Sequence, residues 1–258
     1  MKKIKILIVT AIVGFSLQAN AQTVDKILSN YFENIGGLEN LQKLKGIRMH
    51  AKINQQGMVI PMEITQLKDG KQMTVITFQG KKIKQGVFDG TTLWGTNFMT
   101  MKAEKRTKEA TDNMKLNAND FPDPFINYKK KGYTVTLLGK ETVDGTEAYK
   151  IKLVKEPITI DGKKEDDISY YFFDAENYVP IEVQTEIKSG PMKGQISEVK
   201  MSDYQEVNGI YFPFTLKQGL KGKPGQAINL DKIEVNPKVA MKEFEFPKDT
   251  TTKKENKK

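Results

Sequence analysis

Residues 47–54 read IRMHAKIN, and apolar and polar side chains alternate along this stretch. Ile47, Met49, Ala51 and Ile53 fall on one side of an extended chain, and the residues between them are polar or charged. This period of two predicts a strand that buries one face. Strand patterning also occurs in residues 58–67, 72–78, 82–88 and 92–99. Asp-Gly pairs at 69–70 and 89–90 suit tight turns, so the region predicts a meander of hairpins.

The second half of the chain repeats this pattern. We expect strands at residues 133–138, 148–154, 168–173, 181–187, 195–201, 211–218 and 227–235, with turn residues between nearly all of them. Strands do not alternate with helices, so a parallel sheet is not indicated. An antiparallel sheet of about eleven strands curls and leaves a concave face. The sequence therefore predicts a mainly β (α+β) fold, a strongly curved half-barrel in a single domain over residues 22–247.

Helical segments should cover that concave face. Residues 23–35 have apolar side chains at steps of three and four, with Thr23 placed as N-cap, and a short second helix should end before Gly46. The long connection between residues 102 and 131 lacks alternation, so we predict a weak helix over 102–114 and a short one over 123–130, with Pro124 in its first turn. Because residues 58–67 are apolar at both odd and even positions, we expect that strand to be buried on both faces.

The two ends of the chain have a different composition. Lysines at positions 2, 3 and 5, an apolar run over 6–17 and the small residues of Ala19-Asn20-Ala21 predict a signal peptide over residues 1–21 that is cleaved on export. The chain has no cysteine, so we expect no lipid anchor, and the mature protein should lie free in the periplasm. The basic tail, residues 248–258, should be disordered and could touch membranes transiently.

Composition also argues against several kinds of chemistry. Without cysteine the chain has no disulfides, thiol nucleophiles or sulfur-ligated metals. The formal charge of +9 is concentrated in the two ends, and Arg48 and Arg106 are the only arginines, which disfavours nucleic acid binding. His50 is the only histidine, and no G-x-S-x-G motif occurs, so a hydrolytic triad is not indicated. The Glu165-Asp166-Asp167 cluster fits a solvated turn better than a calcium loop. We expect no enzyme, no cofactor and no metal.

Several segments together carry a resemblance to a known family. An opening helix, VDKIL at 24–28, leads to Ile35-Gly36-Gly37, and FDGTTLW follows at 88–94. YYFFD at 170–174, NGIYFP at 208–213 and FEFP at 244–247 come later in the chain. In this order the chain resembles the LolA/LolB-like superfamily, and specifically periplasmic outer-membrane lipoprotein-sorting proteins. The resemblance implies a half-barrel lidded by helices around an apolar cavity for acyl chains. It also implies an arginine that gates cargo on an early strand, for which only Arg48 matches.

These inferences combine into a candidate site. Methionine and aromatic side chains concentrate in the first half of the chain, and they suit a surface that accepts variable apolar shapes. We predict that the cavity is lined by Met49, Ile60, Met62, Ile64, Phe78, Phe88, Trp94 and Phe98. The predicted lid residues are Ile27, Leu28, Tyr31, Phe32, Phe121 and Phe125.

The leading functional hypothesis is a monomeric periplasmic carrier or chaperone for lipoprotein acyl chains or another lipid. It would act in outer-membrane lipoprotein sorting. An alternative is an envelope sensor or protein-interaction module with the same fold, and an envelope hydrolase is a third possibility. A carrier needs a continuous apolar cavity under the helices, whereas an interaction module would show a filled core and an exposed apolar patch.

Overall fold

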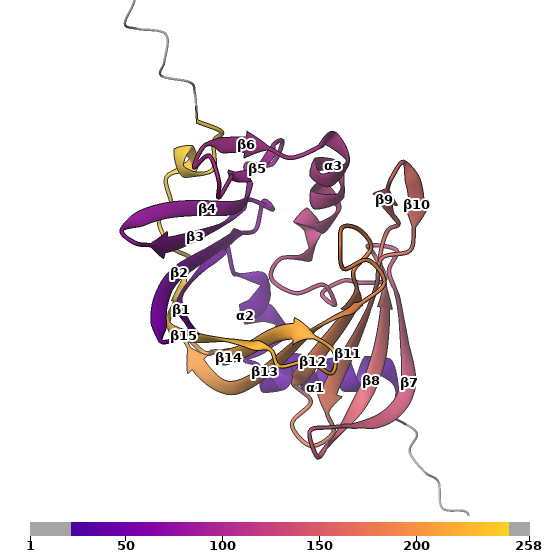
Figure 1. Cartoon of the computed structure of the whole chain (residues 1–258). Helices are drawn as coiled ribbons and strands as arrows, with labels where there is room; N and C mark the ends of the chain where they lie inside the picture. Colours follow the sequence, from indigo (N-terminus) through magenta and orange to yellow (C-terminus); the bar gives the residue numbers. More distant parts are fainter. Residues whose placement is uncertain (1–21, 248–258) are drawn as a thin grey trace, which may run out of the picture.

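One large antiparallel sheet dominates the computed structural model, which describes residues 22–247 (Figure 1). The predicted signal peptide and basic tail lie outside these residues. The helices are α1 (Val24–Asn34), α2 (Leu38–Gln42) and α3 (Lys108–Leu116), with 3-10 turns η1 (Asn117–Asp120) and η2 (Met241–Glu243). The strands are β1 (Gly46–Gln55), β2 (Met58–Leu67), β3 (Gln72–Phe78), β4 (Lys81–Phe88), β5 (Leu93–Thr96), β6 (Ala103–Lys105), β7 (Thr134–Val143), β8 (Thr146–Val154), β9 (Ile158–Ile160), β10 (Lys163–Glu165), β11 (Ile168–Asp174), β12 (Pro180–Glu186), β13 (Ile196–Val207), β14 (Ile210–Leu220) and β15 (Gln226–Val235).

The main sheet has two arms that meet at a seam in its middle. Its thirteen strands run in the order β6-β5-β4-β3-β2-β1-β15-β14-β13-β12-β11-β8-β7, and β9 and β10 form a separate hairpin. We call β1–β6 the first arm and the strands from β7 to β14 in the main sheet the second arm. The last strand, β15, returns to pair with the first, so Ile47 lies opposite Val235. The sheet stays open between β6 and β7, which confirms the predicted half-barrel (Figure 1).

Irregular pairing bends the sheet at four places. Register shifts occur between β1 and β15, β3 and β4, β7 and β8, and β11 and β12. A bulge adds a residue to one strand, so it increases the local twist and bends the ladder. The shifts are spread over both arms, and Figure 1 shows the sheet curving around a central space.

Over β7, β8 and β11, the concave face of the second arm is fully packed. The α1 helix begins at Thr23, whose hydroxyl accepts a hydrogen bond from the Lys26 amide, as predicted. Its apolar face packs with α2 and residues 121–133 against β7, β8 and β11. The Phe173 ring lies 5.2 Å from Tyr31 and 5.6 Å from Phe125, centroid to centroid. These side chains are almost completely buried, so this half of the molecule holds the main hydrophobic core.

Gly36 and Gly209 allow the connection between α1 and α2 to lie directly against the β13–β14 turn. Gly36 has φ +109°, and a Cβ there would lie 2.0 Å from the carbonyl oxygen of Gly209. The neighbouring Ile35 carbonyl accepts a hydrogen bond from the Tyr211 amide at 3.0 Å. A side chain at position 36 would therefore push the helices off the β13–β14 turn.

A second, smaller core lies on the outer face of the first arm. Leu67, Met73, Val87, Trp94 and Phe244 are buried together there. The Trp94 indole donates a hydrogen bond to the Phe244 carbonyl at 2.8 Å, and Phe246 packs edge-on against its ring. The C-terminal segment thus covers this outer face and protects the indole from water.

Three sequence expectations are wrong in detail. Residues 103–105 pair with β5 as strand β6, so the mid-chain helix begins only at Lys108. Residues 123–130 form turns, because Asn127 adopts φ +56° and interrupts any helix there. The β2 strand is not buried on both faces along its whole length, since Val59 is 57% exposed whereas Leu67 is buried in the outer core. The β9–β10 hairpin was not predicted, because its strands have only three residues each.

Candidate functional site

Strand register assigns the side chains of the first arm to two faces. Residues directly opposite one another on neighbouring strands share a face, and alternate residues of one strand do as well. Ile47 packs toward the helices, so Met49, Ala51 and Ile53 of β1 also lie on the concave face. Their partners continue this face on β2 as Ile64, Met62 and Ile60, and on β3 as Thr74 and Ile76.

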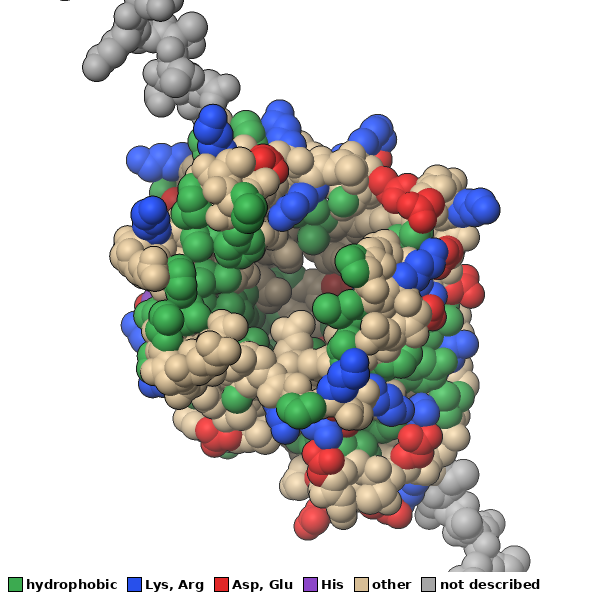
Figure 2. Space-filling view, viewed as in Figure 1, with side chains coloured by type: hydrophobic (Ala, Val, Ile, Leu, Met, Phe, Trp, Pro, Cys, Tyr) green, Lys and Arg blue, Asp and Glu red, His purple; other side chains and the backbone are tan. Residues whose placement is uncertain are grey.

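The concave face of the first arm is apolar and only half covered. Met49, Met62, Ile64, Ile76 and Phe78 are each partly buried, unlike the core residues of the second arm. The central strands extend this wall with further partly buried apolar side chains, Met201, Phe212, Phe214, Leu216 and Ile228. Figure 2 shows a hollow between the two arms with hydrophobic side chains along its rim. An open apolar wall of this kind can accept a nonpolar ligand.

Two cavities mark one end of this hollow. The first, of about 200 Å³, is mostly apolar and lies under α1 and α2, where Ile47, Met201 and Phe212 line it. The second, of about 310 Å³, lies between the arms, with Gln66 and Gln72 on one side and Ser169 and Tyr171 on the other. Tyr171 borders both cavities.

The mid-chain segment bridges the opening between the two arms. Asn113 of α3 exchanges two hydrogen bonds with the backbone of Thr159 in β9, at 2.7 and 2.9 Å. Glu109, also on α3, accepts hydrogen bonds from the amides of Asp161 and Gly162 in the β9–β10 turn. On the other side, η1 approaches the β2–β3 turn so closely that a Cβ on Gly70 would lie 2.5 Å from Ala118 Cβ. This segment therefore joins the two arms at one end of the hollow.

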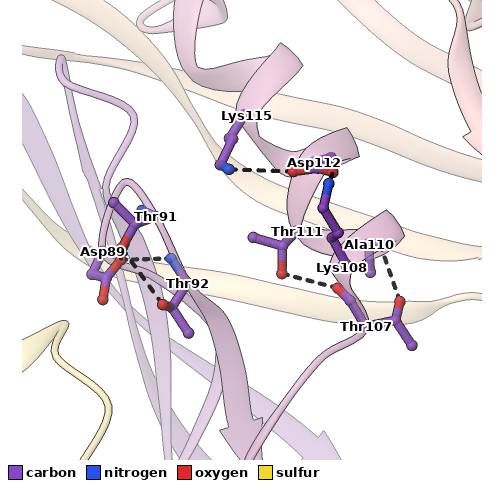
Figure 3. A network of polar contacts seen from close by, with 9 residues as sticks. All are labelled: Asp89, Thr91, Thr92, Thr107, Lys108, Ala110, Thr111, Asp112 and Lys115. Carbon is purple, nitrogen blue, oxygen red and sulfur yellow. Dashed lines mark hydrogen bonds and ion pairs between the residues drawn. The ribbon is translucent and has the colours of Figure 1, made fainter.

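Local polar contacts hold α3 in place (Figure 3). Thr107 caps the helix by accepting a hydrogen bond from the Ala110 amide, and Asp112 pairs with Lys108 and Lys115 on the exposed side. In the nearby β4–β5 turn, the Asp89 carboxylate accepts hydrogen bonds from Thr91 and Thr92. Both motifs satisfy backbone amides that a short helix or turn leaves free.

A buried carboxyl lies beside the apolar cavity. Asp123 accepts hydrogen bonds from the Tyr31 hydroxyl at 2.7 Å and from the Phe125 amide at 2.8 Å. Burial raises the pKa of Asp123 above its ordinary value, although both hydrogen bonds oppose the shift. Burial and the proximity of Asp123 also raise the pKa of Tyr31. The pair ties the α1 helix to residues 121–125.

The predicted lining residues divide between the two faces. The structure brings Met49, Ile60, Met62, Ile64 and Phe78 together on the concave face. Phe88 shares this face through its pairing with Gln72 but is almost completely buried. Trp94 pairs with Val87 and lies in the outer core, and Phe98 is 62% exposed beyond the end of β5. The structure therefore does not bring Trp94 or Phe98 to the concave face.

The predicted lid residues lie in the packed core. Ile27, Leu28, Tyr31, Phe32 and Phe125 are buried, and Phe121 packs against them. They cover the second arm, so α1 lies against strands and does not span the open mouth. The segment that bridges the mouth is α3 with η1.

Arg48 and His50 both lie on the outer face of β1. The Arg48 guanidinium is 3.3 Å from Glu63 Oε1 and 3.3 Å from Thr65 Oγ1. His50 lies between Glu63 and Glu234, with its Nε2 atom 3.2 Å from Glu234 Oε1. The alternation of β1 points these side chains away from the cavity, so Arg48 is not placed to gate it.

The acidic cluster after β10 is paired with lysines. Lys155 Nζ lies 3.0 Å from Asp167, and Lys188 Nζ lies 3.8 Å from Glu165. Over residues 22–247, three or more acidic or histidine side chains nowhere gather closely enough to hold a metal ion. Within the same range, every helix is too short or too polar to cross a bilayer.

Sequence reasoning did not single out the polar end of the hollow. Gln66, Gln72 and Tyr171 converge there from β2, β3 and β11. The available signal was the position of the two glutamines, which continue the inward-facing series of β2 and β3 after its apolar residues end. The sequence could not show that Tyr171 belongs to the same site, because only the folded sheet brings its arm close to the two glutamines.

Solved structures with a similar fold are known, although no similar sequence is found. No family model and no curated protein sequence matches the chain. Among solved structures, a LolA superfamily protein from Nitrosomonas europaea superposes with a TM-score of 0.51 at 15% identity, covering 89% of this chain and 99% of that one. A DUF1329 family protein from Desulfovibrio piger gives a TM-score of 0.50 at 14% identity, covering 85% and 97%. The chain therefore has a LolA-like fold.

Proposed function

We propose that this protein is a periplasmic carrier or chaperone that binds lipoprotein acyl chains or another lipid, in the service of outer-membrane lipoprotein sorting. The observation that carries the proposal is the partly buried apolar wall on the concave face of the first arm and the central strands, opposite β7, β8 and β11, whose concave face is fully packed. Soluble folds seldom leave one side of a core half covered without a partner for it.

The energetics of such a wall suit reversible binding. An acyl chain that removed about 400 Å² of apolar surface from water would gain about 10 kcal/mol. Association costs about 4–15 kcal/mol in lost freedom of motion, so the net affinity stays moderate. A carrier must both load and release its cargo, which a moderate affinity permits. No bond needs to be made or broken in this cycle.

Lipid binding can be tested with matched variants on one strand and its neighbour. We would extract lipid from the purified protein for mass spectrometry and titrate it with a fluorescent fatty acid. Met62 and Ile76 are cross-strand partners on the concave wall, so Met62→Lys with Ile76→Lys should weaken binding by at least about tenfold. Val59→Lys places one lysine charge on the outer face of β2, where the side chain is already exposed, and should leave lipid binding unchanged.

The outcome separates a carrier from a protein without a lipid site. If no lipid co-purifies and the fatty acid does not bind, the carrier function is wrong. If the concave and outer variants bind equally well, a lipid binds elsewhere on the molecule.

One surface feature favours the alternative, an envelope sensor or interaction module. A groove of about 610 Å³ runs between α1 and residues 125–130, lined in part by Leu28, Phe32 and Tyr128. Leu38 at its edge is 39% exposed. Under this alternative, the wild-type protein would bind no lipid, and Leu38→Asp would abolish its association with an envelope protein partner.

A further inference from the structure

Three polar side chains at one end of the hollow lack partners within the protein. Gln66 and Gln72 are cross-strand neighbours at the adjoining ends of β2 and β3, and both are partly buried. Neither side-chain amide makes a hydrogen bond to residues 22–247. Tyr171 of β11 lines the same 310 Å³ cavity, and its hydroxyl makes no hydrogen bond within the described part of the chain.

The unpartnered atoms of these side chains remain open to water, since every fully buried side-chain nitrogen or oxygen in residues 22–247 has a hydrogen-bond partner. Most polar groups in folded proteins are paired with protein or with ordered water. Here two amides and one hydroxyl offer both donors and acceptors to a single cavity. A ligand group that reproduces the hydrogen bonds of the displaced water would bind there with little loss of hydrogen-bond energy.

The charged residues around this cavity are already neutralised. Lys155 Nζ lies 3.1 Å from Asp120, 3.0 Å from Asp167 and 2.7 Å from Asn117 Oδ1. Lys71 pairs with Asp69. Asp120 is held further by Lys131 at 3.3 Å. Three lysines thus face three aspartates, so neither an anionic nor a cationic ligand gains an unpaired counter-charge.

The apolar wall begins directly beside the glutamines. From Gln66 the inward-facing positions of β2 continue as Ile64, Met62 and Ile60, a distance of about 20 Å at the usual rise per residue. An acyl chain in one leaflet of a bilayer spans about 15 Å. The wall is therefore long enough for one extended chain whose polar end lies at the glutamines.

We propose that Gln66, Gln72 and Tyr171 form a head-group site for acyl lipids with an uncharged hydrogen-bonding head, such as an ester, amide or hydroxyl. This inference rests on the carrier function proposed above and names its ligand class. The wall would hold the acyl chain, and the balanced ion pairs would favour neutral heads over carboxylates and phosphates.

Competition between lipids with one shared chain tests the inference. Monooleoylglycerol, oleate and oleoyl lysophosphatidylglycerol would each displace a fluorescent fatty acid from the purified full chain, below their micelle concentrations. We expect monooleoylglycerol to compete at least about tenfold better than either charged lipid, because a carboxylate or phosphate would lose hydration at this site without gaining an unpaired counter-charge. Oleate or the phospholipid competing equally well or better would overturn the head-group site.

Substitutions at the three polar residues test whether they cause the preference for monooleoylglycerol. Replacing both amides, Gln66→Leu with Gln72→Leu, should abolish the preference for monooleoylglycerol while oleate still binds. Tyr171→Phe keeps the ring and should reduce the preference about threefold. Gln55→Leu, an exposed position at the far end of the same hairpin, should leave it unchanged. If the double variant fails to fold, Tyr171→Phe decides, and an unchanged preference there contradicts the inference.

The failures of the two proposals look different. If none of the three lipids displaces the probe, and the probe itself does not bind, the carrier function is wrong. If all bind but the three substitutions leave the ranking of the lipids unchanged, the carrier stands and the head-group site is wrong.

Discussion

The two arms of this sheet have the same alternating strand pattern but bury different faces. In the second arm, α1, α2 and residues 121–133 seal the concave face of β7, β8 and β11 into a core with Phe173 at its centre. In the first arm the concave face stays half open, and the C-terminal segment seals the outer face over Trp94. The comparison teaches that stability and ligand capacity lie on different faces. The concave face is closed over β7, β8 and β11, whereas over the first arm and the neighbouring strands β13 and β14 it stays half covered.

The largest expected difference between the arms concerns packing. Phe173→Ala removes a fully buried ring and should lower the free energy of unfolding by about 3–5 kcal/mol. Phe78→Ala removes the same ring from the half-open wall and should cost about 1–2 kcal/mol. Urea unfolding of both variants checks this, and equal losses would show that the first arm is packed as tightly as the second.

Ligand binding should act on one arm selectively. A bound lipid at about one hundred times its Kd should raise the free energy of unfolding by about 2.7 kcal/mol. Hydrogen exchange should show added protection in β1, β2 and β3, beyond the global gain seen in β8 and β11. Protection confined to α1 and residues 125–130 would instead indicate that the lipid binds in the groove between them.

The bridge between the arms should be weaker than either core. Glu109→Ala with Asn113→Ala removes four hydrogen bonds that join α3 to the β9–β10 hairpin, which should free the hairpin at a cost of about 2 kcal/mol. Faster hydrogen exchange at residues 158–165, with β8 and β11 unchanged, is the expected result. Asp112→Ala alters the exposed side of the same helix and serves as the control.

The smallest effect is a pH dependence with opposite signs in the two arms. Burial raises the pKa of Asp123, so its favourable contribution to stability is present at low pH and is lost as pH rises through the raised value. Asp123→Asn should therefore gain stability relative to wild type as pH rises from acid conditions toward neutrality. Thermal unfolding across this range measures the trend.

Asp89 in the first arm supplies the matched control. Burial alone would raise its pKa, but hydrogen bonds from Thr92 and Thr91 outweigh burial and lower it. The contribution of Asp89 is present at neutral pH and lost as pH falls, so Asp89→Asn should lose stability relative to wild type as pH rises. Parallel trends for the two variants would contradict both assignments.

The sequence predicted the architecture well because both periods were long and regular. The alternation over residues 47–54 and the helical spacing over 23–35 each extend for enough residues to indicate their element. Short elements such as β9 and β10 lack that length. Pro124 suits the first turn of a helix over residues 123–130, but the left-handed conformation of Asn127 could not be foreseen.

Face assignments were harder to predict than elements. A shift of one residue in register moves a side chain to the opposite face. The irregular pairing between β3 and β4 keeps Phe88 on the concave face, while Val87 and its partner Trp94 lie on the outer face. Arg48 and Met49 are adjacent in one strand, so both could not face the cavity. The glutamine site escaped prediction because it combines strands more than ninety residues apart.

The central position of β15 bears on the order of assembly. Each arm is a succession of neighbouring strands and can form from local contacts, whereas the β1–β15 seam joins residues near opposite ends of the chain. Closing such a long loop is slow, because its entropy is lost before its contacts are gained. During synthesis from the N-terminus, the strands within each arm can therefore pair before β15 is available to pair with β1. Until β15 pairs with β1 and β14, the two arms are not joined, and the apolar wall of the first arm does not continue across the central strands.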